Sequence, residues 1–365
     1  MTRLLTPGEV APWFHGAALD SNPNYAFNSV GGRWIVMLFM GSGTAPGSAD
    51  ALALLARHRN YFDDDRACFF GVTMDPQDAA QRRIAQSLPG IRWFLDYDGA
   101  ISTQFGALRD QHYHPHWLLI DPMMRVRQIA PLAEGEALIA TLRSSPPPLP
   151  DIDPPVIIVP DIFPPPLCRH LISLHEQGGG EDSGFMREEN GITVLKLDHS
   201  HKRRQDHMIQ DAALIAQLKG RMASTLRPMI HRAFQFDVTR VERFLIACYD
   251  AERGGYFRPH RDNTTKGTAH RRFACTINLN AEEYQGGELR FPEYGVRSYR
   301  APTGGALVFS CSLLHEALPV TSGRRYAFLP FFYDDAAAHI REQNVGFLAP
   351  DIGGYTSGLQ EEAAE

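Results

Sequence analysis

A proline-rich segment at residues 144–155, SSPPPLPDIDPP, constrains the fold more than any other feature of this sequence. Proline fixes φ and has no backbone N–H, so a run of prolines neither continues a helix nor joins a sheet. The chain has 365 residues, about the length of two ordinary domains. We therefore expect a stiff connector between two folded units, residues 1–145 and 156–335, and a loose C-terminal tail at 336–365.

The N-terminal half alternates between two hydrophobic patterns. Residues 33–40 (RWIVMLFM), 67–74 (ACFFGVTM) and 116–122 (HWLLIDP) have the continuous apolar character of buried strands, while residues 49–62 and 78–88 have helical spacing. Strands that alternate with helices are typical of an α/β domain. This half is therefore predicted to contain a parallel-type sheet covered by helices.

The C-terminal half has a different pattern. After helices expected near 166–177 and 211–233, it becomes a series of short strands separated by glycine- and proline-containing turns. These strands are expected at 241–249, 271–280, 287–291, 306–310 and 324–333. The pattern predicts an antiparallel sandwich or barrel, and the whole chain an α+β protein of two domains.

Charge and cysteine content exclude several classes of function. The net charge of -6 and the pI near 6.2 argue against nucleic acid as an obligatory partner, because phosphate-binding surfaces are basic. The five cysteines include no CxxC pair, which favours free thiols in a reducing compartment. The N-terminus has no signal-peptide pattern, and the longest apolar run, residues 34–40, is too short for a membrane span. We expect a cytoplasmic protein without a membrane partner.

Three residues of the C-terminal half suggest a metal site. His260 and Asp262 occur in YFRPHRDN, and His315 in SLLHEALPV. Residues two apart on a strand point to the same side, and two histidines with one carboxylate can hold one face of an Fe(II) ion. His-x-Asp alone is weak in a chain with 15 histidines, where a solvated turn explains it as well. Arg325, ten residues after His315, adds a guanidinium that can pair with a carboxylate of a dicarboxylic acid.

A family resemblance connects these residues. Residues 156–335 resemble the prolyl-hydroxylase-like branch of the Fe(II)/2-oxoglutarate dioxygenases in three blocks: FLIACYDAERGGYFRPHRDN, FACTINLN followed by QGGELRFPE, and ALVFSCSLLHEALPVTSGRRYAF. The resemblance implies a double-stranded β-helix, or jelly roll, with flanking helices. It also implies that His260, Asp262 and His315 ligate the iron and that Arg325 binds the distal carboxylate of 2-oxoglutarate.

Two further residues take roles from the same resemblance. Tyr249 would hydrogen-bond the co-substrate, and Asn278 occupies a position where relatives often carry a tyrosine. The neighbouring Arg324 alternates to the other face of its strand, where we expect it to meet solvent.

The resemblance also implies a reaction. The enzyme would use O2 and 2-oxoglutarate to hydroxylate an unactivated C–H bond, with succinate and CO2 as co-products and ascorbate as a candidate reductant. We favour an amino-acid residue of a peptide or protein as acceptor, with a small metabolite as the alternative. A third hypothesis is a non-catalytic module that senses O2 or 2-oxoglutarate. The sequence does not determine the oligomeric state, and a homo-oligomer is compatible with it.

The N-terminal half resembles the thioredoxin-like peroxiredoxins. The resemblance rests on VMLFMGSGTAPGSADALALL, FFGVTMD, FLDYDGAISTQFGA and HWLLIDP. The cysteine that a peroxiredoxin carries three residues after Thr44 is here Gly47, and the remaining Cys68 is expected to be a core residue. The sequence therefore contradicts a thiol peroxidase, the rival enzyme class, and leaves recruitment, dimerisation or substrate presentation as uses of this domain.

Three other polar segments are interpreted as ordinary solvent-facing structure rather than as functional sites. The run DHSHKRRQDH, residues 198–207, is interpreted as a solvated segment rather than a second metal site. Residues 270–272 (HRR) are interpreted as a solvated strand end, with contact to an acidic substrate as the alternative. The alternating histidines of 112–116 are interpreted as a polar loop rather than a metal site.

Overall fold

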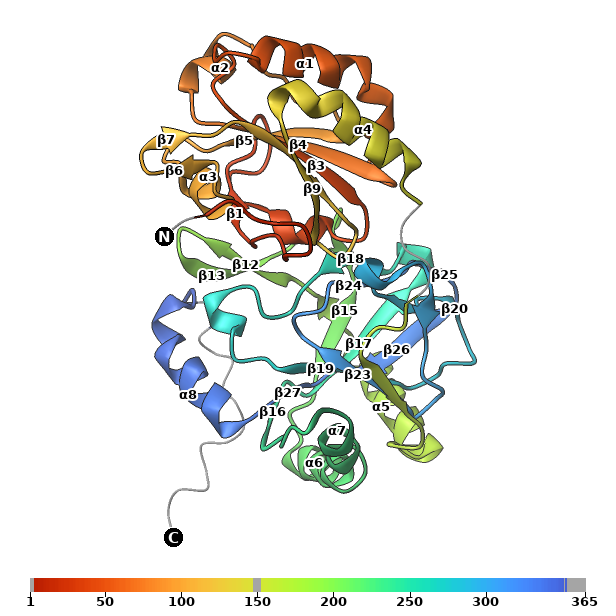
Figure 1. Ribbon diagram of the computed structural model, residues 1–365. Helices are drawn as coiled ribbons and strands as arrows, with labels where there is room; N and C mark the ends of the chain where they lie inside the picture. The colour runs from red at the N-terminus through yellow and green to blue at the C-terminus, as the bar shows by residue number, and fades with distance from the viewer. Residues whose placement is uncertain (1–2, 147–151, 351, 353–365) are drawn as a thin grey trace. The chain divides into compact units, whose positions relative to one another are not determined.

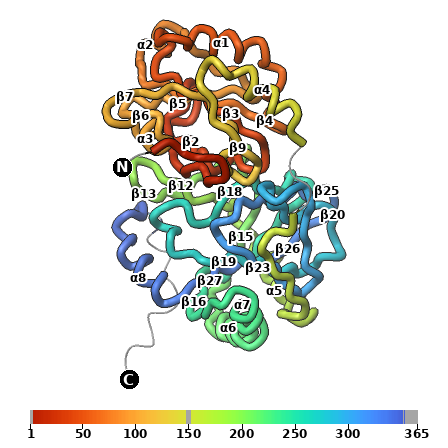
Figure 2. The backbone as a smooth tube through the Cα atoms, viewed as in Figure 1, coloured from red at the N-terminus to blue at the C-terminus, as the bar shows by residue number. Residues whose placement is uncertain are grey.

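The computed structural model describes residues 3–146, 152–350 and 352. The chain forms two compact units, one of residues up to Ile152 together with Pro292–Val296, the other of Asp153–Phe291 and the described residues from Arg297 onward. Figure 1 labels their elements, and Figure 2 traces the same backbone as a tube. In the described ranges, no helix has the length and apolar character needed to cross a membrane.

The N-terminal unit contains a five-stranded mixed sheet of order β5-β4-β3-β8-β9. Its strands are β3 (Trp34–Gly41), β4 (Ala67–Thr73), β5 (Ile91–Leu95), β8 (His116–Ile120) and β9 (Val126–Pro131). Strands β3, β4 and β5 are parallel, as the alternating pattern predicts. Strand β8 runs antiparallel to both β3 and β9, so the sheet is mixed and the predicted parallel-type order does not extend to that edge.

Both faces of this sheet are covered, which explains the continuous apolar strands. Residues 34–40 of β3 are all buried. One face packs against helices α1 and α4, and the other against a cluster rich in phenylalanine. The four helices are α1 (Ser48–Arg57), α2 (Pro76–Ala80), α3 (Ala100–Gln104) and α4 (Gly135–Ser144), and the minor strands are β1 (His15–Gly16), β2 (Tyr25–Ala26), β6 (Leu108–Arg109) and β7 (His112–Tyr113).

The helix expected over residues 78–88 is wrong beyond its first turn. Helix α2 ends at Ala80, and Arg82 has a φ of 55°, in the left-handed region that ends a helix. The buried carboxylate of Asp78 accepts hydrogen bonds from the Gly43 backbone N–H at 2.8 Å and from Arg83 at 3.0 Å. These contacts with distant and local groups replace further helical turns.

The C-terminal unit is built on two facing sets of antiparallel strands. The larger sheet has the order β10-β23-β19-β26-β17-β15-β11, with β27 pairing β16 and β19. Its strands are β10 (Val156–Val159), β11 (Glu181–Asp182), β15 (Gln205–Met208), β16 (Arg240–Glu242), β17 (Leu245–Asp250), β19 (Phe273–Asn278), β23 (Ala306–Ser310), β26 (Arg324–Phe328) and β27 (Phe331–Tyr333).

The smaller sheet has the order β14-β18-β24-β21-β22, and two separate two-stranded sheets accompany it. Its strands are β14 (Lys202–Arg203), β18 (Tyr256–His260), β21 (Leu289–Arg290), β22 (Ser298–Tyr299) and β24 (His315–Ala317). The two-stranded sheets are the hairpin of β12 (Phe185–Glu189) with β13 (Ile192–Lys196), and the pair of β20 (Gln285–Gly286) with β25 (Val320–Ser322). This antiparallel arrangement is the predicted jelly-roll type.

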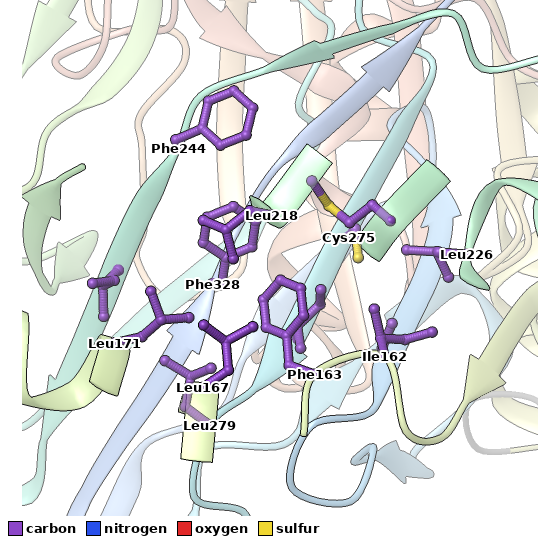
Figure 3. Packing of buried hydrophobic residues seen from close by; sticks show 14 of the residues in the cluster. Ile162, Phe163, Leu167, Leu171, Leu218, Leu226, Phe244, Cys275, Leu279 and Phe328 are labelled. Atoms are coloured by element: carbon purple, nitrogen blue, oxygen red, sulfur yellow. The ribbon is translucent and has the colours of Figure 1, made fainter. Parts of the chain in front are cut away.

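Helices pack on one face of the larger sheet and form the core with it. They are α5 (Pro165–Gly178), α6 (Ala212–Thr225) and α7 (Arg227–Phe234). Figure 3 shows how Leu167 and Leu171 of α5 and Leu218 of α6 meet Phe328 of β26 and Cys275 of β19. Side chains that point to the opposite face of the same strands are therefore free to line a cavity.

Two predicted elements of this unit are interrupted. The helix expected over 211–233 divides at Leu226, because Pro228 lies in the first turn of α7 and cannot donate a backbone hydrogen bond. The strand expected over 241–249 divides at Arg243, whose φ of 71° breaks the extended backbone between β16 and β17.

The loose tail expected from residue 336 is corrected by a helix. Helix α8 spans Asp335–Gln343, and the Asp334 carboxylate caps it by accepting from the Ala337 backbone N–H at 2.8 Å. The capping aspartate is the signal that the expectation overlooked. The later part of the predicted tail, residues 353–365, lies outside the described residues.

Candidate metal centre and co-substrate cavity

Two neighbouring strands of the smaller sheet bring the predicted metal ligands together. His260 ends β18 and His315 begins β24, and the two are direct partners in the antiparallel register. Asp262 follows β18, with its carboxylate oxygens 3.7 Å from His260 Nε2 and 3.4 Å from His315 Nε2. In the described part of the chain this is the one group of three such side chains whose ligand atoms all lie within 4.8 Å of one another.

Backbone carbonyls orient both imidazoles toward a common point. His260 Nδ1 lies 2.8 Å from the Arg258 carbonyl oxygen, and His315 Nδ1 lies 3.0 Å from the Leu313 carbonyl oxygen. With Nδ1–H donating, each Nε2 keeps its lone pair for a metal. Burial lowers the pKa of His260 well below its usual value, and the nearby His315 lowers it further. The neutral, metal-binding form is therefore favoured.

The triad opens into a cavity of about 310 Å³ in the C-terminal unit. Arg325 of β26, Tyr249 of β17 and Thr276 of β19 also line it. The Arg325 side chain is only 2% exposed, and its Nη2 donates to Thr276 Oγ1 at 2.9 Å. Its other two nitrogens, Nε and Nη1, are buried and find no hydrogen-bond partner among the described residues.

The residues present fit both Fe(II) and a dicarboxylic acid. Two imidazole nitrogens and one carboxylate oxygen are the donor set of a non-haem Fe(II) site with open positions. A buried guanidinium with two unpartnered nitrogens is costly unless an anion completes its hydrogen bonds. Arg325 therefore needs a ligand of the kind that a carboxylate supplies.

The other two predicted co-substrate residues have different outcomes. Tyr249 lies in the cavity wall, and its hydroxyl oxygen accepts from Arg204 Nη1 at 3.4 Å. Asn278 is not among the cavity-lining residues, and its Nδ2 donates to the Ala301 carbonyl oxygen at 2.7 Å, so its role toward the co-substrate stays a prediction that this contact does not support. Thr276, two residues earlier on the same strand face, takes the place beside Arg325.

Sequence reasoning missed a charged group that lies inside the cavity wall. Lys202, Arg204 and Asp206 belong to the run interpreted as solvated, but Lys202 is only 4% and Arg204 only 7% exposed. Arg204 Nε and Nη2 each donate to the Asp206 carboxylate at 2.6 Å. The signal was the i, i+2 spacing of the three residues, which places them on one face of an extended segment.

The basic segment at residues 270–272 is also partly buried rather than solvated. His270 Nε2 lies 2.6 Å from Glu242, and Arg271 Nη2 donates to the same carboxylate at 2.7 Å. Arg272 is half-buried and donates to the Ala269 carbonyl oxygen. Arg324 meets solvent as expected, with its side chain 53% exposed, and pairs with Asp250 at 3.0 Å.

The N-terminal unit lacks the arrangement of a thiol peroxidase. Gly47 precedes the first residue of α1 with a φ of 83°, where the resemblance places a reactive cysteine. Cys68 is fully buried in β4, and burial raises the pKa of its thiol to about 12. A thiol with such a high pKa is not ionised at neutral pH and is not a nucleophile.

The sequence of the C-terminal unit matches a known family. Residues 244–333 match the 2OG-Fe(II) oxygenase superfamily, a segment that includes the triad and Arg325. The C-terminal half is a 2OG-Fe(II) oxygenase domain. Residues 7–129 match the AhpC/TSA family, so the N-terminal half is a thioredoxin-like domain of that kind.

Individual relatives are similar to parts of the oxygenase half. A PKHD-type hydroxylase of Synechococcus sp. (strain JA-2-3B'a(2-13)) is 34% identical over 93 residues, 24% of this chain and 41% of the relative. The PKHD-type hydroxylase PiuC of Pseudomonas aeruginosa is 33% identical over 147 residues, 38% of this chain and 61% of the relative. The chain thus spans less than two thirds of the length of either relative. Among solved structures, a Pseudomonas putida prolyl-4-hydroxylase has 18% identity and a TM-score of 0.36, covering 55% of this chain and 100% of that one.

Proposed function

We propose that the chain is an Fe(II)- and 2-oxoglutarate-dependent dioxygenase that hydroxylates an unactivated C–H bond. The observation that carries the proposal is the buried Arg325 guanidinium, whose two unpartnered nitrogens line the same cavity as His260, Asp262 and His315. A metal site alone is compatible with many functions. A metal triad and a buried guanidinium that can pair with a carboxylate lie in one cavity. This combination favours a chelating dicarboxylic acid such as 2-oxoglutarate as ligand.

Each protein residue then has a definite task. His260 and His315 would present Nε2 lone pairs and Asp262 one carboxylate oxygen, with the backbone carbonyls holding both rings in place. Iron and 2-oxoglutarate together supply the oxidising chemistry, in which O2 is consumed, succinate and CO2 are released and a C–H bond becomes C–OH. Arg325 would bind the distal carboxylate, with Thr276 fixing the guanidinium from one side.

Two aromatic rings pack against the histidines of the triad. The Phe257 ring stacks on His260 with 3.5 Å between ring centroids, and Phe309 meets the edge of His315 at 4.5 Å. Apolar walls around a metal keep competing water away and strengthen the electrostatic interactions inside. We infer that the acceptor enters through the part of the cavity that is lined by polar and charged side chains.

We infer that the acceptor is an amino-acid residue of a peptide or protein. Two relatives support this inference. The procollagen lysyl hydroxylase and glycosyltransferase of Acanthamoeba polyphaga mimivirus is 25% identical to part of this chain, and the multifunctional procollagen lysine hydroxylase and glycosyltransferase of Rattus norvegicus is 27% identical. A small metabolite is the alternative acceptor. A catalytically silent sensor of O2 or 2-oxoglutarate is disfavoured, because the three ligand side chains and the anion-binding arginine are all present.

The experiment that tests the proposal is an anaerobic titration of the metal-free protein with Fe(II) and 2-oxoglutarate. Chelation of the iron by the keto acid is expected to produce a visible charge-transfer band. The band should be absent in His260→Ala and should require a much higher 2-oxoglutarate concentration in Arg325→Gln. A folded wild-type protein that gives no band would contradict the assignment.

A further inference from the structure

The cavity contains more cationic side chains than 2-oxoglutarate needs. The lining cations are Lys202, Arg204, Arg243, Arg261, Arg271 and Arg325. Two of them have carboxylate partners: Asp206 pairs with Arg204 at 2.6 Å, and Glu242 pairs with Arg271 at 2.7 Å. Arg325 is assigned to the co-substrate. Of the remaining three, Arg261 is held by the Ser312 carbonyl oxygen, to which its Nη1 donates. Lys202 and Arg243 form no ion pair with a carboxylate among the described residues.

The Lys202 amino group lies inside the protein, where its hydrogen-bond partners are neutral. Its Nζ donates to Ser183 Oγ at 2.6 Å and to the Gly184 carbonyl oxygen, and it lies 4.8 Å from the centroid of the Phe257 ring. An ammonium ion has three N–H donors, so these contacts leave one unused. Burial lowers the pKa of Lys202 well below its usual value, and Asp206 opposes this shift only in part, so a bound carboxylate would be needed to stabilise the charged form.

Arg243 is a rigidly placed cation in the same wall. Its Nε and Nη2 both donate to the Leu329 carbonyl oxygen, at 3.2 and 3.1 Å. Its guanidinium carbon lies 4.4 Å from the centroid of Phe331, and Arg271 lies 4.0 Å from the same centroid. The stacking and the backbone bonds fix the plane of the Arg243 guanidinium, so little conformational entropy would be lost when an anion binds to it.

Lys202 lies near a metal ligand, and Arg243 lines the same cavity. The Phe257 ring beneath Lys202 is the ring that stacks on His260. The positive charge of Arg243 acts on Lys202, and both act on Asp206, which places them in one electrostatic environment. The lining acids Glu181 and Asp182 are exposed, where solvent screens their charge.

We propose that Lys202 and Arg243 form an anion-binding subsite for the acceptor, and that the acceptor carries a carboxylate near the C–H bond that is hydroxylated. This inference rests on the proposed function, because it assigns Arg325 to 2-oxoglutarate and the remaining cations to the second substrate. The carboxylate belongs either to a free acidic metabolite or to an acidic residue of a peptide, and the probes below separate the two.

The test uses the full chain loaded with Mn(II) and 2-oxoglutarate, which is bound but does not turn over, in a titration calorimeter. One probe is N-acetyl-L-glutamate, paired with neutral N-acetyl-L-glutamine amide. The other is the peptide acetyl-Gly-Gly-Glu-Gly-Gly-amide, paired with its glutamine counterpart. At least one acid probe should bind about tenfold more tightly than its neutral partner, since a charge-assisted contact is worth about that factor.

Two variants test whether the preference for the acid probe depends on Lys202 and Arg243. The acid-over-neutral ratio should fall below about twofold in Lys202→Met and in Arg243→Gln. It should be unchanged in Lys219→Met, a matched replacement on helix α6, which does not line the cavity. If Lys202→Met fails to fold, as judged by its melting curve, Arg243→Gln carries the test alone.

Three results would overturn the inference: equal binding of acid and neutral probes, no binding of either acid probe at millimolar concentration, or a preference that survives in a folded Lys202→Met. Loss of 2-oxoglutarate binding in that variant would overturn it as well, by assigning Lys202 to the co-substrate. If the wild-type protein does not bind 2-oxoglutarate at all, the proposed function itself fails. If it binds 2-oxoglutarate but does not discriminate the probes, only the acceptor subsite fails.

Discussion

Arg325 and Tyr249 face one another across adjacent antiparallel strands, and the Arg325 guanidinium carbon lies 5.0 Å from the centre of the Tyr249 ring. The ring covers the cation and keeps water from it, while the in-plane N–H groups stay available to a ligand. A cross-strand pair of this kind fixes the position of the guanidinium before any ligand binds. The cost of ordering the side chain is thus met during folding.

The first prediction concerns the charge of Arg325. Replacing it with glutamine should raise the 2-oxoglutarate dissociation constant by about 10- to 100-fold, because a charged hydrogen bond contributes about 1.5–3 kcal/mol. The measurement is an anaerobic titration that follows the visible band of the iron–keto-acid chelate. Arg324→Gln is the matched control: the side chain is exposed and pairs with Asp250, so its loss should leave the constant within about twofold. Equal effects of the two changes would contradict the assignment.

The second prediction concerns the metal triad. A ligand that binds only the folded state stabilises it, by about 2.7 kcal/mol at a concentration 100 times its dissociation constant. Added Mn(II) at that excess should therefore raise the melting temperature of the oxygenase half by about 5–10 °C, because 1 kcal/mol shifts that of a domain of this size by about 2–4 °C. His315→Ala should abolish the increase, whereas His199→Ala, at an exposed histidine, should retain it. An increase that persists in His315→Ala would place the metal elsewhere.

The metal ligands could be predicted from the sequence because their geometry is largely local. His260 and Asp262 are two residues apart at a strand end, and strand periodicity alone puts them on one side. The approach of His315 depends on the pairing of β18 with β24, a long-range contact that only the family resemblance anticipated. Arg325 followed from the same resemblance, and Asn278 shows that a position can match while its side chain turns to another partner.

Strand periodicity could place Lys202, Arg204 and Asp206 on one face, but it could not show that this face is buried. A charged run such as DHSHKRRQDH is usually solvated, because burying unpaired charges is costly. Here Arg204 is buried with a counter-ion two residues away, and Tyr249, 45 residues further on, accepts from it. The predicted length of the helix at 78–88 was too great for a related reason. The contact of Asp78 with Gly43 joins residues far apart in the sequence, so a local pattern does not reveal it.

The third prediction follows from His201, which lies against the rings of Phe185 at 4.5 Å and Phe257 at 5.5 Å. Burial lowers its pKa from 6.5 to about 4. Between these values the unfolded chain binds a proton that the folded chain does not. The stability contributed by neutral His201 is therefore complete above pH 6.5 and is lost as the pH falls toward 4.

This dependence can be measured in the oxygenase half by hydrogen exchange of β14 and β18 at pH 7 and pH 5, corrected for the intrinsic exchange rate. The loss of protection at pH 5 should be smaller in His201→Phe, which keeps the aromatic contacts and removes the titration. His339→Phe, at an exposed helical site, should behave as the wild type. A pH response identical in all three proteins would rule out His201 as its source.

The last prediction concerns the thiols and tests the rival thiol-peroxidase function. All five cysteines are buried, and burial raises the pKa of Cys168 and of Cys248 to about 11 and that of Cys68 to about 12. Because only thiolates react quickly with disulfide reagents, the native protein should release no thionitrobenzoate from Ellman's reagent at pH 8, and the unfolded protein about five equivalents. Gly47→Cys, at an exposed position before α1, is the positive control and should add one fast equivalent. Peroxide consumption that disappears in Cys68→Ser would instead restore a catalytic role to the N-terminal domain.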